Sequence, residues 1–319
     1  MNISSVISVR PSAATIAILC AASIVASGTP LSPEARAQER NSQGIHVQTN
    51  YVNVLASVLA PDGHPIPDLP KDAFQIFEDG VSQEIDRFEA ETNQPLDLAL
   101  MVDSSLSTQK DLKFEAEAAA RFIRQVVRPG DNLSVFQFSD YVVQLSEFSS
   151  NVPAQQAAAH RIYPGAGTAM YDALVLGSHA LEHLPTGRRR VIVLVTDAGE
   201  TTSAWKFEDA RRAAIASEAL IYSIVIRPVP NESGRNTAGE HALITITDDT
   251  GGALYYLDSF DQLQAMFDRI DRELRTQYLL GYYPRPTPPP GTYRHIELRV
   301  QGGGTLHYRK EYLTAKGSK

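Results

Sequence analysis

The order of hydrophobic and polar positions divides this chain into three regions. Between residues 95 and 276, short apolar runs alternate with stretches whose apolar residues recur every three or four positions. The short runs predict buried strands and the longer stretches predict helices. We expect strands at residues 97–102, 133–138, 142–145, 190–195, 219–226 and 253–257, and helices at residues 112–126, 170–184, 208–217 and 263–274. This alternation predicts an α/β fold with a doubly wound, mostly parallel sheet.

The two flanking regions consist of short alternating runs separated by turn residues. Before the central region, residues 47–54, 56–59, 73–78 and 81–88 are strand-like, and Asp79-Gly80 is a hairpin turn. After it, residues 278–283, 293–300 and 306–312 are strand-like. So few strands from one side are marginally stable alone. We therefore expect residues 38–94 and 277–319 to form one β-sandwich, with residues 95–276 inserted between its halves.

The N-terminal residues resemble a secretory signal peptide. An apolar run at residues 13–26 follows Arg10, and Ala35-Arg36-Ala37 has the small residues of a cleavage site. The run is shorter than the ~20 residues that span a bilayer. We expect residues 1–37 to be removed and the protein to be secreted or periplasmic, with no transmembrane segment in the mature chain; an uncleaved membrane anchor is the alternative.

Charge and cysteine content narrow the choice of partners and compartment. The formal net charge is −8, which disfavours nucleic acid and anionic lipid as partners. The basic run Arg188-Arg189-Arg190 is expected to be a solvated loop rather than a phosphate contact. The single cysteine, Cys20, lies inside the apolar leader, so the mature chain would form no disulfide within itself.

Candidate metal ligands follow the first central strand. Asp103, Ser105 and Ser107 place oxygen-bearing side chains at alternate positions after an apolar run. Hydroxyl and carboxylate oxygens suit Mg²⁺, Mn²⁺ or Ca²⁺. Thr168 before a helix and Asp197 after a second apolar run could complete the site, because parallel strands end at one edge of a sheet.

This pattern resembles the metal-ion-dependent adhesion site of von Willebrand factor type A domains. The resemblance covers residues 95–276 and implies a metal shell formed by Asp103, Ser105, Ser107, Thr168 and Asp197. Ala198 departs from the pattern, since the family usually has glycine there. The segments Leu69-Pro70-Lys71-Asp72-Ala73-Phe74 and Leu279-Leu280-Gly281-Tyr282-Tyr283 are further similar to a group of secreted, acidobacterial-type von Willebrand A-related proteins.

Two catalytic alternatives fit the sequence less well. His179-Ala180-Leu181-Glu182-His183 matches the His-x-x-Glu-His pattern of inverted zinc peptidases, but no following helix supplies the further carboxylate. A serine hydrolase would need a Gly-x-Ser-x-Gly elbow, which the sequence lacks. We expect no catalytic residues and no enzymatic activity.

The resemblance implies a binding function. In such sites the hydroxyls contact the ion directly and the aspartates act largely through water, which leaves the ion able to accept a carboxylate. We expect a divalent cation, Mg²⁺ or else Mn²⁺ or Ca²⁺, that bridges to an Asp or Glu of a protein partner. The alternatives are a structural envelope scaffold and a metal-dependent hydrolase. The sequence leaves the oligomeric state open.

Overall fold

A six-stranded sheet lies at the centre of the fold in a computed structural model, which describes residues 51–90, 92–106, 112–227 and 236–315. The strand order is β10-β9-β8-β5-β6-β7, and only β7 runs antiparallel to its neighbour. The strands are β5 (Leu96–Asp103), β6 (Asn132–Phe138), β7 (Val142–Gln144), β8 (Arg189–Thr196), β9 (Leu220–Ile226) and β10 (Leu254–Leu257). Every residue of β5 is buried, because strands flank it on both edges and helices cover both faces.

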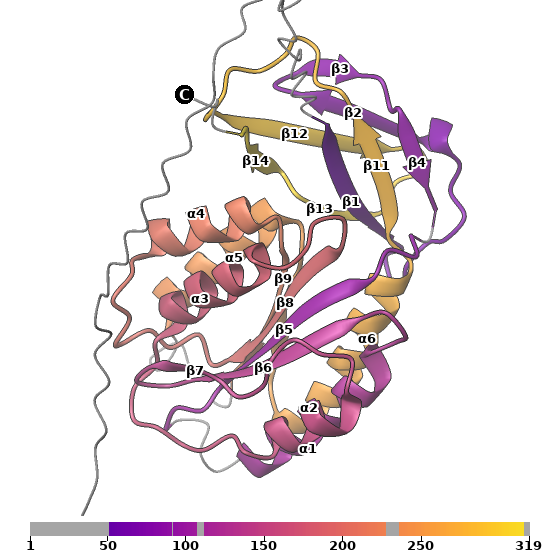
Figure 1. The fold of residues 1–319 in the computed structure, drawn as a ribbon. Helices are drawn as coiled ribbons and strands as arrows, with labels where there is room; N and C mark the ends of the chain where they lie inside the picture. Colours follow the sequence, from indigo (N-terminus) through magenta and orange to yellow (C-terminus); the bar gives the residue numbers. More distant parts are fainter. Residues whose placement is uncertain (1–50, 91, 107–111, 228–235, 316–319) are drawn as a thin grey trace, which may run out of the picture. The chain divides into compact units, whose positions relative to one another are not determined.

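Helices cover both faces of this sheet (Figure 1). They are α1 (Leu112–Val126), α2 (Val152–Ala159), α3 (Met170–Glu182), α4 (Phe207–Ser217), α5 (Thr237–Thr250) and α6 (Leu263–Arg275). Helices α1, α2 and α6 share one hydrophobic core with the sheet, while α3, α4 and α5 share another. The predicted doubly wound α/β fold is confirmed. None of the helices described here is long and apolar enough to cross a bilayer.

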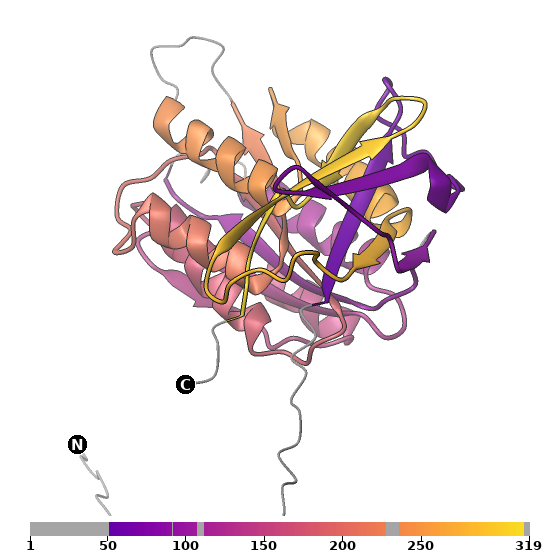
Figure 2. The same ribbon diagram turned by 90° about the horizontal axis from the view of Figure 1, so that it is seen from above.

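The flanking regions form two further four-stranded sheets, ordered β13-β1-β11-β4 and β14-β12-β2-β3. Their strands are β1 (Val52–Leu59), β2 (Phe74–Glu78), β3 (Val81–Gln83), β4 (Arg87–Glu89), β11 (Tyr278–Tyr282), β12 (Tyr293–Val300), β13 (Thr305–Tyr308) and β14 (Glu311–Leu313). Single-turn 3₁₀ helices occupy Lys71–Ala73 and Phe260–Gln262. Both sheets combine N- and C-terminal strands, which share one core (Figures 1 and 2).

A buried carboxylate links the two sheets of this sandwich. Glu78 on β2 is 1% exposed. It accepts hydrogen bonds from the hydroxyl groups of Tyr282, at 2.7 Å, and Tyr312, at 2.9 Å. Arg294 Nε donates a third bond at 2.9 Å. Because Tyr282 belongs to one sheet and the other three residues to the second, the network connects strands from both ends of the sequence.

Several elements differ from the pattern-based expectation. The run at residues 81–88 splits into β3 and β4, and the run at 306–312 splits into β13 and β14; in each case the two strands belong to different sheets. Helix α5 was not predicted, because its threonine-rich sequence has low helix propensity and is stabilised by packing. The short helix α2 was also missed. Residues 47–50 of the first predicted strand lie outside the described residues.

The turn between β13 and β14 contacts the α/β domain. Three consecutive residues each form an ion pair with it: Arg309 with Glu218 at 2.8 Å, Lys310 with Asp248, and Glu311 with Arg211 at 2.7 Å. The backbone also approaches closely, since a Cβ added to Gly251 would lie 2.1 Å from the backbone nitrogen of Arg309. Charge and close packing together attach the sandwich to helices α4 and α5.

Candidate metal site

The predicted ligands lie where β5 and β8 end. Asp103 is the last residue of β5, and Asp197 follows the last residue of β8. Thr168 lies two residues before α3, whose preceding loop is tied to β5 by a hydrogen bond from Gly165 N to Ser104 O at 2.8 Å. This is the edge of the sheet at which open α/β folds bind ligands.

Asp103 is held rigidly below the surface. Its side chain is buried, and the residue is 1% exposed. Oδ1 accepts a hydrogen bond from the backbone nitrogen of Ser105 at 2.9 Å, and Oδ2 accepts one from Thr196 Oγ1 at 2.7 Å. The carboxylate therefore fixes the course of the serine-bearing loop, and Ser105 is itself 2% exposed.

Asp197 and Thr168 meet beside Gly199. The backbone nitrogen of Gly199 donates a hydrogen bond to Asp197 Oδ1 at 2.9 Å. A Cβ on Gly199 would lie 2.9 Å from that same oxygen and 3.2 Å from Thr168 Oγ1. Any larger residue at this position would crowd both oxygens. Glycine thus keeps open the space that the Asp197 and Thr168 side chains face.

The electrostatics of the two aspartates favour a cation. Burial, followed by the charge of Asp197, raises the pKa of Asp103 to about 6. Hydrogen bonds from Thr196 and Ser105 oppose this rise without cancelling it. A divalent cation between the carboxylates would relieve their repulsion, and the hydroxyls of Ser105 and Thr168 add the hard oxygen donors that Mg²⁺ prefers. The residues present therefore fit the expected ion.

Four of the five predicted ligands can be placed. Asp103, Ser105, Thr168 and Asp197 come from the adjoining loops that follow β5, precede α3 and follow β8. Ser107 lies outside the described residues. The role of all five residues as metal ligands stays a prediction.

Two residues that position the site were not found from the sequence. Thr196 donates to Asp103 and also accepts a hydrogen bond from Ala198 N at 3.0 Å, which connects the two aspartate loops. Asp140 accepts bonds from the backbone nitrogens of Ala166, at 2.7 Å, and Gly167, at 2.9 Å. The sequence signal for both was a polar residue at the end of a buried strand, which alone is too common to be decisive.

Ala198 has the backbone conformation that explains why glycine is usual there. Its φ is 63°, in the left-handed region, which costs a non-glycine residue about 1–2 kcal/mol. Helix α5 holds the loop in place, since a Cβ on Gly239 would lie 2.0 Å from the carbonyl oxygen of Ala198. The departure from the family pattern therefore adds strain while the loop keeps its course.

Replacing Thr196 with valine should weaken Mg²⁺ binding by roughly 10-fold, a typical loss when a residue that orients a metal ligand is removed. Valine keeps the shape but cannot donate to Asp103 or accept from Ala198. Isothermal titration calorimetry on the mature protein measures the change. Thr245→Val on α5, whose hydroxyl bonds only to its own helix at His241 O, is the matched control. Equal affinity in the two variants would show that Thr196 does not position the site.

The histidine motif does not form a comparable site. His179 and His183 are exposed at the C-terminal end of α3, and His183 Nδ1 lies 2.6 Å from the carbonyl oxygen of His179. Within the described ranges, no group of three His, Cys, Asp or Glu residues is placed to hold a metal. The zinc peptidase alternative gains no support from this arrangement.

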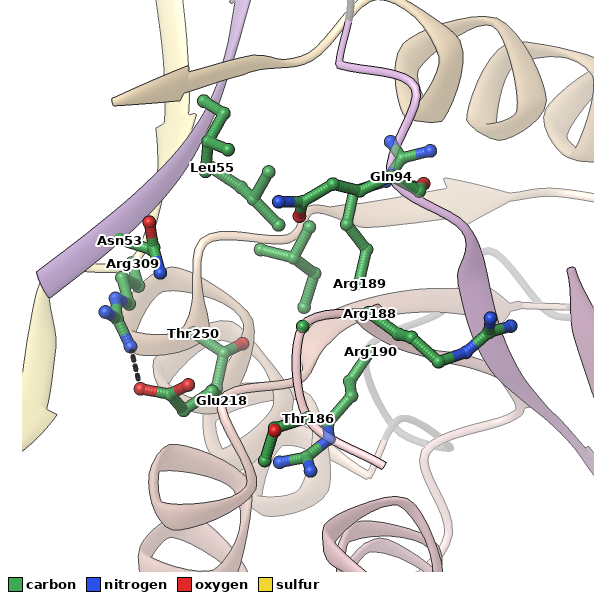
Figure 3. A pocket seen from close by; sticks show the side chains of 13 residues that line it. Asn53, Leu55, Gln94, Thr186, Arg188, Arg189, Arg190, Glu218, Thr250 and Arg309 are labelled. Carbon is green, nitrogen blue, oxygen red and sulfur yellow. Dashed lines mark hydrogen bonds and ion pairs between the residues drawn. The ribbon is translucent and has the colours of Figure 1, made fainter. Parts of the chain in front are cut away.

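The arginine run lies at the opposite end of β8, beside a cavity of about 120 Å³ (Figure 3). The three side chains extend in different directions rather than converging on the cavity. Arg188 pairs with Asp97 at 2.8 Å, Arg189 donates to Leu274 O at 2.5 Å, and Arg190 donates to Ser217 O at 2.9 Å. The expectation of a solvated loop is wrong, most clearly for Arg189, which is 2% exposed. These arginines satisfy carbonyl groups at the base of the sheet.

Comparison with known proteins finds one family match, in the central part of the chain. Residues 98–200 match the family model of the von Willebrand factor type A domain. No curated protein matches the chain. The acidobacterial-type subgroup stays a prediction.

Several solved structures resemble the chain at low sequence identity. The protein BatB from Bacteroides thetaiotaomicron is 16% identical, with 56% of this chain and 98% of that one covered and a TM-score of 0.44. A von Willebrand factor type A protein from Catenulispora acidiphila is 11% identical, with coverage of 85% and 74% and a TM-score of 0.49. The von Willebrand domain of the pilus tip protein Mfa5 from Porphyromonas gingivalis is 13% identical, with coverage of 57% and 95% and a TM-score of 0.46.

Proposed function

We propose that this chain is a secreted or periplasmic, non-enzymatic module that binds a protein partner through a divalent cation, Mg²⁺ or else Mn²⁺ or Ca²⁺. The observation that carries the proposal is that the Asp103 and Asp197 carboxylates are close enough to repel each other, with the hydroxyl-bearing residues Ser105 and Thr168 on the same loops or the adjoining one. The bound cation would supply a positive centre able to accept a carboxylate of the partner. The chain's own residues would hold and orient that centre.

The arrangement favours binding over turnover. The raised pKa of Asp103, about 6, lies in the range of a general base. However, Ser105 and Thr196 each bond to one of its oxygens and the residue is 1% exposed, which favours a role in holding the loops over one in proton transfer. The neighbouring candidate ligands, Ser105 and Thr168, carry hydroxyl groups, which suit ion coordination.

The localisation part of the proposal rests on the N-terminal sequence. Arg10, the apolar run at residues 13–26 and the Ala35-Arg36-Ala37 site form a leader pattern. With its only cysteine inside that leader, the mature chain would depend on its packed cores in an oxidising compartment.

The test combines metal titration with partner capture. The mature chain should bind Mg²⁺ or Mn²⁺ in a calorimetric titration, and immobilised protein should retain envelope proteins in Mg²⁺ but release them in chelator. Retention that survives chelation would favour the scaffold alternative. Metal-dependent conversion of a retained molecule would favour a hydrolase.

A further inference from the structure

The loops at this edge of the sheet, three of which hold the candidate ligands, also carry exposed apolar side chains. Four such residues, which we call the apolar rim, are Leu106, Tyr141, Tyr163 and Trp205, exposed by 57%, 58%, 43% and 39%. Soluble proteins bury most large apolar groups, and a cluster that stays exposed around one site commonly marks an interface.

Three of the rim residues are connected to the candidate site by their loops. Leu106 directly follows Ser105. The backbone nitrogen of Tyr163 donates a hydrogen bond to Gln137 Oε1 at 3.1 Å. Two residues later, the backbone nitrogen of Gly165 donates to Ser104 O. Trp205 N donates to Asp172 Oδ1 at 2.9 Å, in the first turn of the helix that follows Thr168. These three rim residues therefore lie on loops that carry candidate ligands.

Two of the rim residues are neighbours. The Tyr141 hydroxyl, as the first cause, raises the pKa of Tyr163. Tyrosine and tryptophan lose little side-chain entropy on binding and bury a large area, which is why they dominate binding hot spots.

The charge around the rim limits what the partner can carry. The other acidic groups on these loops are occupied by backbone nitrogens: Asp140 by Ala166 and Gly167, Glu200 by Tyr171 and Ser203, and Asp172 by Trp205. With a chain net charge of −8, a strongly acidic partner surface would be repelled beyond the site itself. This charge favours a partner with few acidic groups.

We infer that the partner is a protein segment in which a single Asp or Glu is flanked by aliphatic or aromatic residues, and that the apolar rim receives those flanking residues. This inference rests on the proposed metal-dependent function, because the carboxylate itself is assigned to the cation. The rim then decides which carboxylate-bearing segments bind well.

Trp205 allows a direct test, because it is the only tryptophan in the chain and lies in the rim. Its fluorescence is followed while three blocked peptides are titrated into the Mg²⁺-loaded mature protein: Gly-Phe-Glu-Leu-Gly, Gly-Gly-Glu-Gly-Gly and Gly-Phe-Gln-Leu-Gly. We expect the first to bind at least about 10-fold more tightly than the second, since a buried aromatic or aliphatic anchor contributes at least that much. The third should not bind, and chelator should abolish binding of the first.

Variants separate the rim from the metal. Tyr141→Ala and Tyr163→Ala should each remove most of the preference for apolar flanks and leave the calorimetric Mg²⁺ affinity unchanged. Tyr293→Ala, which removes a 45% exposed tyrosine from strand β12 of the sandwich, is the matched control and should change neither.

Equal binding of the first two peptides, or no peptide binding by Mg²⁺-loaded protein, would overturn the inference while the metal site stands. Absence of Mg²⁺ binding would overturn the proposed function itself, and binding of the Gln peptide without metal would show a purely apolar surface instead.

Discussion

Replacing Asp103 with alanine is expected to lower the affinity for Mg²⁺ and Mn²⁺ by about 100-fold or more, the upper end of losses seen around metal sites. The change removes a negative charge from the candidate site and also the acceptor that fixes Ser105 N and Thr196 Oγ1. Both the charge and the course of the serine loop would be lost. Calorimetric titration of the mature protein with each metal measures the effect.

The fold of this variant should survive without metal. The pKa of Asp103 rises from its ordinary 3.8 to about 6, so the native state holds the ionised form at a cost of roughly 3 kcal/mol. Because the folded pKa lies above the unfolded one, this group stabilises the fold less as pH rises through about 6. Alanine removes that cost at neutral pH, which offsets the two lost hydrogen bonds. Thermal unfolding of the metal-free proteins tests this point.

Two sets of variants make the result specific. His179→Ala and His183→Ala change exposed side chains far along α3 from Thr168 and should leave metal affinity unaltered. Thr168→Ala should retain part of the metal affinity but impair partner capture, because its hydroxyl is expected to contact the ion in the bound state. If the histidine variants lost the metal and Asp103→Ala kept it, the adhesion-type site would be wrong and zinc would have to be reconsidered.

The sequence was sufficient for the core of the fold because its central strands are continuous apolar runs. The middle residues of strands β5 and β8, 98–102 and 191–195, are all apolar and buried, so these runs are easily recognised. Helix α5 gave no such signal, since Thr237–Thr250 carries threonines and aspartates that disfavour helix locally. Its stability comes from contacts with the sheet, which a local pattern does not contain.

The candidate site was predictable to the extent that its residues follow strand ends in order. Asp103, Thr168 and Asp197 could be grouped because parallel strands and the helices after them share one edge. Thr196 could not, because its role depends on a side-chain bond to a residue 93 positions away. Arg189 was misjudged for a similar reason: its hydrogen-bond partners, Gln94, Leu274 and Gln277, are distant in the sequence. Long-range hydrogen bonds of this kind leave no periodic trace.

A second buried carboxylate connects the α/β domain to the sandwich. Glu273 on α6 is 1% exposed and accepts hydrogen bonds from Tyr222 at 2.9 Å and Tyr255 at 3.0 Å. His307 Nδ1, on strand β13 of the sandwich, lies 2.8 Å from its Oε1. Burial alone would raise the pKa of Glu273, but the bond and charge of His307 and the bond from Tyr222 outweigh burial and lower it. The ionised form is therefore stabilised by the native contacts.

Replacing Glu273 with alanine should lower the free energy of unfolding by about 3–5 kcal/mol, since two buried tyrosine hydroxyls and His307 would lose their common acceptor. Because the folded pKa lies below the unfolded one, the wild-type contribution is present above the ordinary pKa of a glutamate and is lost as pH falls through the folded value. The variant should accordingly show a smaller loss of stability on acidification. Urea unfolding at neutral and acidic pH measures both effects, with the exposed Glu117→Ala on α1 as control, expected to change stability by no more than about 0.5 kcal/mol. A Glu273→Ala protein as stable as this control would show that the buried network does not hold the sandwich and the α/β domain together.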